Sequence, residues 1–104
     1  MERQVHRSGL LPTPYLAAEA AAWVVERGFR IPGVDAVTPE LPGHLPTPSY
    51  PCPVHHTLPG NGVLILENLV LSEVAGTRFS LFVGALKIIG GDGAWARVLA
   101  LPST

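Results

Sequence analysis

The feature that most restricts the fold of this chain is a run of prolines in the middle of its sequence. Residues 38–53, TPELPGHLPTPSYPCP, contain six prolines, at positions 39, 42, 46, 48, 51 and 53. Each proline fixes its φ angle at about −65° and lacks the amide hydrogen that helices and sheets require. We therefore expect neither a helix nor a strand in this segment, but a proline-rich loop that is either ordered or mobile.

Before this loop, residues 13–28 carry the pattern of an amphipathic helix. Thr13 can cap such a helix, Pro14 suits its first position, and Gly28 can end it in the left-handed conformation. Apolar residues recur at helical spacing on one face, namely Leu16, Ala20, Trp23 and Val24. This pattern predicts a helix whose apolar face covers a sheet.

The rest of the chain is typical of strands and turns. Pro32 places the first expected strand at a sheet edge or a bulge. The connection GGDGAW, residues 90–95, is glycine-rich and predicts a hairpin, while residues 68–79 predict a short helical turn. The segments expected to form strands are 29–37, 62–67, 78–89 and 96–101. The sequence thus predicts an α/β fold, a mixed β-sheet covered by one main helix, with at least one open edge or face.

Composition excludes several classes of function. The 104 residues form one domain at most, and a net charge of -1 provides no basic field for a nucleic acid. Cys52 is the only cysteine, so no intrachain disulfide can form. The start of the sequence lacks the apolar core of a secretory signal, and no stretch approaches the roughly 20 apolar residues of a membrane span. We expect a cytoplasmic protein with neither a nucleic acid nor a membrane as its partner.

The residues that can carry chemistry lie around the strand expected at 62–67. Cys52, His55 and His56 form a C-x-x-H-H cluster, and Glu67 stands at the end of the strand. An imidazole at the end of a loop and a carboxylate at a strand end can converge on a cation such as Zn²⁺ or Mn²⁺. Spacing alone leaves three interpretations open: a metal pair of His55 and Glu67, half of a zinc site through Cys52, or solvated side chains.

Three segments, taken in their order along the chain, resemble a known enzyme family. They are YLAAEAAAWVVERGFRIPGVDAVTPE (15–40), PVHHTLPGNGVLILENLVLSEVAGTRFSL (53–81) and ALKIIGGDGAWARVLA (85–100). Together they resemble the cyclase family of metal-dependent hydrolases, which includes kynurenine formamidase and isatin hydrolase. The resemblance implies that residues 1–104 are a single partial domain, the C-terminal half of the swivelling β/β/α fold of that family.

The resemblance also implies a metal site. In that family a histidine precedes a strand of the form G-[IV]-x-I-[LI]-E-[NG]-L, and this histidine and the glutamate belong to the active-site metal cluster. By resemblance they fall on His55 and Glu67, with His56 as an auxiliary candidate. The main metal motif of the family, H-x-G-T-H-x-D-x-P-x-H, which also carries the histidine thought to act as acid and base, does not occur in this sequence.

The activity implied by the resemblance is that of an arylformamidase, an enzyme of tryptophan catabolism. It would hydrolyse a small N-formyl or cyclic amide with a divalent zinc or manganese ion. Because the main motif is missing, we expect this chain to be inactive alone and to work with a complementary N-terminal half chain or as a homo-oligomer. The alternative is a noncatalytic, homo-oligomeric interaction module that has the same half-fold.

Overall fold

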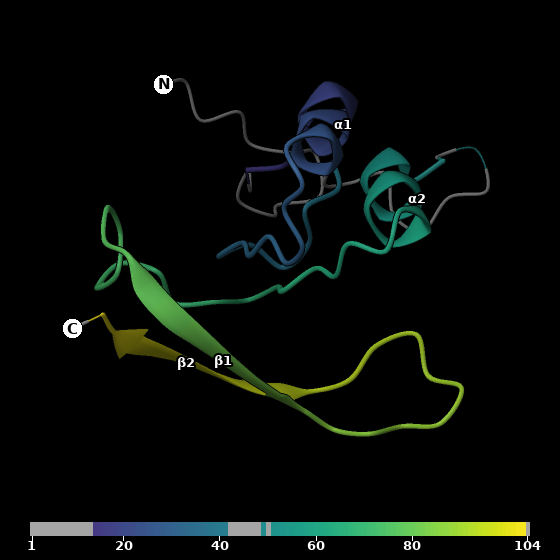
Figure 1. Cartoon of the computed structure of the whole chain (residues 1–104). Coiled ribbons are helices and arrows are strands. Elements are labelled where there is room, and N and C mark those ends of the chain that lie inside the picture. Colours follow the sequence, from purple (N-terminus) through teal and green to yellow (C-terminus); the bar gives the residue numbers. More distant parts are fainter. Residues whose placement is uncertain (1–13, 42–48, 50, 104) are drawn as a thin grey trace, which may run out of the picture. The chain divides into compact units, whose positions relative to one another are not determined.

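The structure, a computed structural model, describes residues 14–41, 49 and 51–103. Its elements are two helices and two strands (Figure 1): α1 (Ala18–Glu26), α2 (Pro53–Gly60), β1 (Phe79–Ala85) and β2 (Ala96–Pro102). Both helices lie in one compact unit, residues 1–69, and both strands lie in a second, residues 70–104. The expected α/β class is confirmed. The single partial domain expected over the whole chain stays a prediction.

The first helix has no side-chain cap at its start and ends in backbone hydrogen bonds. α1 starts at Ala18, four residues beyond Pro14, and its N-cap residue makes no side-chain hydrogen bond. The predicted cap, Thr13, lies outside the described residues. At the other end Gly28 adopts a φ of 75°, as expected. The amides of Gly28 and Phe29 donate to the carbonyls of Val25 and Val24, the paired bonds of a Schellman motif.

The partner of α1 is α2, not the sheet that the sequence predicts. The two helices pack side by side in Figure 1, and Ala21 of α1 is fully buried between them. The other members of this core are Val54, Leu58 and Val63, with Leu16, Val24, Val25 and Ile65 packed against it. Trp23, expected on the buried face, is 48% exposed and lies beside Phe29, with 5.6 Å between ring centroids.

The second helix corrects the expected end of the proline-rich loop. Pro53 opens α2, and a proline is tolerated there because the first amide of a helix has no partner within the helix. Consequently His55 lies in the first turn of a helix, and not in a loop. Val54 and Leu58 are both fully buried, so tertiary packing stabilises a short helix that its sequence alone would not favour.

The segments expected as strands at 29–37 and 62–67 are paired, although they form no regular sheet. They run parallel and meet in one isolated bridge, between Gly33 and Leu66. Hydrogen bonds from backbone amides to backbone carbonyls extend this pairing. The donor and acceptor residues are Leu64 and Arg30, Leu66 and Pro32, Val34 and Leu66, and Asn68 and Ala36, all at 2.9 to 3.0 Å. Pro32 takes part through its carbonyl, so its missing amide breaks no bond. This pairing fixes the backbone just before and after Glu67.

The second unit is the predicted hairpin. β1 and β2 pair antiparallel, from Phe79 opposite Pro102 to Ala85 opposite Ala96. The amide of Leu86 donates to the carbonyl of Trp95 at 3.1 Å and continues the pairing into the connection. The short helical turn expected at 68–79 is a series of hydrogen-bonded turns instead. Within the described residues, neither helix is long and apolar enough to cross a bilayer.

The core between the helices gives a direct test of this fold. Replacing the fully buried Leu58 by alanine should lower the free energy of unfolding by about 2–5 kcal/mol, because it removes apolar contacts and leaves a cavity. The matched control is Leu64→Ala, the same change at a side chain that is 64% exposed, for which we expect at most about 0.5 kcal/mol. Urea unfolding followed by the circular dichroism of the helices measures both, and equal effects would contradict the assigned core.

Candidate metal site

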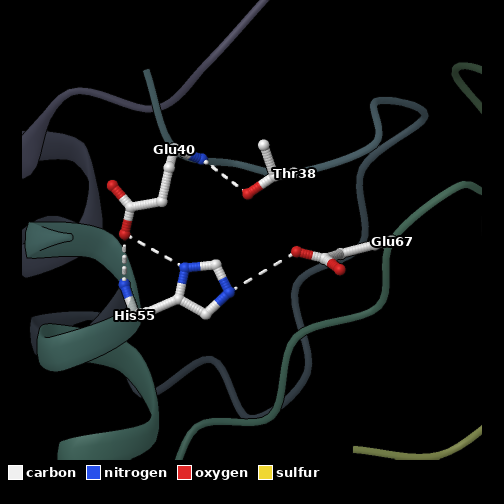
Figure 2. Close-up of polar contacts among 4 residues, drawn as sticks. All are labelled: Thr38, Glu40, His55 and Glu67. Atoms are coloured by element: carbon white, nitrogen blue, oxygen red, sulfur yellow. Dashed lines mark hydrogen bonds and ion pairs between the residues drawn. The ribbon is translucent and has the colours of Figure 1, made fainter. Parts of the chain in front are cut away.

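The structure brings together the two residues that the sequence predicts as metal ligands. Nε2 of His55, in the first turn of α2, lies 3.5 Å from Oε1 of Glu67, which directly follows the bridge residue Leu66 (Figure 2). Their side chains are 42% and 34% exposed, so the pair is open to solvent. Residues 12 positions apart thus meet through tertiary structure, since α2 and the paired segment 64–69 belong to the same unit.

A third residue, Glu40, completes the arrangement. Its side chain is fully buried, and its Oε1 accepts two hydrogen bonds from His55: one from the backbone amide at 2.7 Å and one from ring Nδ1 at 3.1 Å. The amide of Glu40 itself donates to Oγ1 of Thr38 at 3.2 Å. Figure 2 shows the imidazole between the two carboxylates, with Glu40 on its Nδ1 side and Glu67 on its Nε2 side.

Sequence reasoning missed Glu40. The residue lies in the segment 38–53, which the prolines mark as a loop, and a loop carboxylate is ordinarily solvated. The sequence offered no local signal for this role, because it did not predict α2. Cys52, the N-cap of α2, makes no side-chain cap hydrogen bond, so the amides of the first turn need an acceptor from elsewhere in the chain. A charged residue brought near by the loop is one way to supply it.

The hydrogen bonds define what the imidazole can do. A carboxylate only accepts, so the contact with Glu40 requires a hydrogen on Nδ1. In the neutral ring this leaves a lone pair on Nε2, the nitrogen that faces Glu67. The 3.5 Å between Nε2 and Oε1 is longer than the roughly 2.7–3.2 Å of an N–H···O hydrogen bond. It is close to the spacing of about 3.4 Å between two ligands of a tetrahedral zinc with bonds of about 2.1 Å.

The donor set therefore fits a divalent cation. A neutral imidazole nitrogen and a carboxylate oxygen suit zinc and also manganese. The fit is partial, because the described part of the chain contains no group of three or more His, Cys, Asp or Glu residues that could hold a metal ion.

The other two residues of the C-x-x-H-H cluster form no metal-binding group with this pair among the described residues. Cys52 is a partly exposed free thiol with a φ of 45°, and its carbonyl accepts from the amide of His56 at 3.0 Å. His56 itself is exposed. The pair that the structure forms is His55 with Glu67, so a zinc site through Cys52 gains no support.

The chain was compared with known proteins. No protein-family model matches it. A kynurenine formamidase of Bacillus cereus is 34% identical over 89 residues, a match that covers 86% of this chain and 40% of that enzyme. A kynurenine formamidase of Salinibacter ruber is 40% identical over 67 residues, 64% of this chain and 32% of that enzyme. The chain is thus similar in sequence to part of the kynurenine formamidases.

A solved structure supports the same relationship. It is described as a potential metal-dependent hydrolase with cyclase activity, is 32% identical in sequence and gives a TM-score of 0.63 over 81% of this chain and 39% of its own. The resemblance to the cyclase family is thus confirmed. The chain spans about 40% of the length of the Bacillus kynurenine formamidase that it matches. The roles of His55 and Glu67 in metal binding stay predictions.

Variants of the pair test the metal assignment. We expect the purified chain to bind zinc weakly, because two ligands leave the ion incompletely coordinated, and we expect His55→Ala and Glu67→Gln each to weaken binding at least about tenfold. His56→Ala and Cys52→Ser are the matched controls and should leave the affinity unchanged. Isothermal titration calorimetry with zinc measures the affinity of each variant. Loss of binding in Cys52→Ser but not in Glu67→Gln would contradict the assignment.

Proposed function

We propose that His55 and Glu67 are part of the metal centre of an amide hydrolase of the kynurenine formamidase type. The observation that carries this proposal is the geometry of the pair: Nε2 and Oε1 stand 3.5 Å apart on separate segments, while the buried Glu40 holds the opposite ring nitrogen. The relatives support the class of reaction, since those reported above are kynurenine formamidases and a potential metal-dependent hydrolase.

The chain's own residues would bind and orient the metal ion. A bound zinc or manganese ion supplies Lewis acidity, which polarises an amide carbonyl and makes water a stronger nucleophile near neutral pH. His55 would donate its Nε2 lone pair, and Glu67 would add a negative charge that offsets the charge of the cation. Because both side chains are about one-third exposed or more, a substrate can approach the pair from solvent.

The pair is too small a ligand set for catalysis. Catalytic zinc usually has three protein ligands and one open position, and no residue of this chain is assigned as the acid and base. We therefore propose that the remaining ligands come from a polypeptide segment with the motif H-x-G-T-H-x-D-x-P-x-H, which these 104 residues lack. The substrate class that we propose is a small N-formyl or cyclic amide, which the 104 residues alone would not hydrolyse.

Complementation tests this function. We expect the chain, mixed with a second polypeptide that carries the missing motif, to release formate from the N-formyl derivative of kynurenine when zinc or manganese is present. Each polypeptide alone should be inactive. His55→Ala should abolish the activity of the mixture, and His56→Ala, the matched control at an exposed neighbour, should not. Formate release that persists with EDTA, or no release at any ratio of the two polypeptides, would contradict the proposal.

The hairpin supports a second candidate, the noncatalytic homo-oligomeric module. Large apolar side chains of β1, β2 and their connection are exposed, including Phe82 at 52%, Leu99 at 45%, Ile89 at 95% and Trp95 at 87%. Exposed apolar surface of this kind often marks a protein interface. The strand edges of a two-stranded hairpin can also pair with another chain.

Sedimentation with and without EDTA separates the two candidates. The noncatalytic module predicts a stable dimer whose mass does not depend on EDTA, and it predicts that His55→Ala leaves both mass and stability unchanged. Phe82→Ser should dissociate such a dimer, because it places a hydroxyl in the apolar interface. A monomer at all concentrations tested would rule this candidate out.

A further inference from the structure

We infer that Glu40 is a positioning residue, which holds the imidazole of His55 in the tautomer and orientation that present Nε2 to a metal ion. This inference rests on the proposed function for the identity of the group that Nε2 meets. The hydrogen bonds that fix the ring are properties of the chain itself, and they can be tested without any metal.

The two hydrogen bonds received by Glu40 have an unusual source. Both come from one residue and end on one oxygen: the amide and ring Nδ1 of His55 donate to the same Oε1, at 2.7 and 3.1 Å. A carboxylate that receives both groups fixes the ring relative to the backbone of its own residue. Rotation of the imidazole away from Glu67 would break the ring bond while the amide bond remained. The direction of Nε2 therefore depends on Glu40.

Glu40 is itself held in place. It is fully buried, and so is the preceding Pro39. The carbonyl of Pro39 accepts from the amide of Leu16 at 2.8 Å, and Oγ1 of Thr38 accepts from the amide of Glu40. The backbone that carries this carboxylate is thus held by hydrogen bonds that do not involve the ring of His55. Such anchored acceptors behind a histidine ligand raise its basicity and fix its orientation, and their loss typically weakens metal binding about 10- to 100-fold.

The same oxygen also caps α2. His55 is the third residue of the helix after its N-cap, Cys52, and the amide at this position is one that capping side chains ordinarily satisfy. A carboxylate is favourable there because the N-terminal end of a helix carries partial positive charge. Glu40 therefore has two separable effects, one on the stability of α2 through the amide and one on the ring through Nδ1.

The effect of Glu40 on the tautomer of the His55 ring can be measured on the metal-free chain. The method is ¹H–¹⁵N NMR of the histidine side chains at a pH where they are neutral. We expect His55 to show the Nδ1–H tautomer and Glu40→Gln to reduce the population of this tautomer, because the amide can donate to Nδ1 as well as accept. Glu73→Gln, the same change at an exposed residue, is the control and should have no effect. An unchanged His55 tautomer in Glu40→Gln would overturn the inference.

A double-mutant cycle separates positioning from capping. In zinc titrations followed by NMR, Glu40→Gln should weaken binding about tenfold in the wild-type chain and should have no further effect in the His55→Ala background, where the ring is absent. The effect of Glu40→Gln on the unfolding of α2 should persist in the His55→Ala background, since the backbone amide of residue 55 remains. An equal loss of affinity in both backgrounds would overturn the positioning role. Absence of zinc binding in the wild type, together with the expected tautomer change, would count against the proposed function alone.

Discussion

The contact between the Glu40 carboxylate and His55 is the interaction on which the site depends. It joins the start of the proline-rich segment to the first turn of α2, two stretches 15 residues apart. Burying a carboxylate costs free energy unless its oxygens accept hydrogen bonds. Here the amide and ring Nδ1 of His55 donate to it, and these bonds fix the direction of the ring. Glu40 is consequently hydrogen-bonded both to the first turn of α2 and to the imidazole of His55.

Glu67 reaches the imidazole through a different constraint, the parallel pairing around Gly33 and Leu66. Gly33 permits this close approach: a Cβ there would lie 2.6 Å from Cδ1 of Leu69. Directly after Glu67, Asn68 adopts a φ of 56°, a left-handed conformation that asparagine and glycine tolerate better than other residues. This explains in physical terms why asparagine or glycine follows the glutamate in the pattern G-[IV]-x-I-[LI]-E-[NG]-L.

Local patterns of the sequence predicted part of this structure. The end of α1 at Gly28 and the hairpin of β1 and β2 follow from the backbone preferences of glycine and from apolar runs, which act over a few residues. The pairing of His55 with Glu67 was predicted through the family resemblance, because spacing alone left other interpretations open. α2 was missed because an eight-residue helix with Pro53 and Pro59 has little intrinsic stability and depends on packing that local patterns do not reveal. Glu40 was missed for a related reason, since its partner is fixed only by the tertiary fold.

We propose that an imidazole and a carboxylate of this chain, those of His55 and Glu67, bind the metal ion together. X-ray absorption of the chain, with protein in excess over zinc, can decide this because the method identifies the ligand atoms. We expect nitrogen and oxygen ligands at about 2.0–2.2 Å. We also expect an outer-shell signal from one imidazole, which should disappear in His55→Ala. A sulfur ligand at about 2.3 Å would place the metal on Cys52 and exclude joint binding by His55 and Glu67.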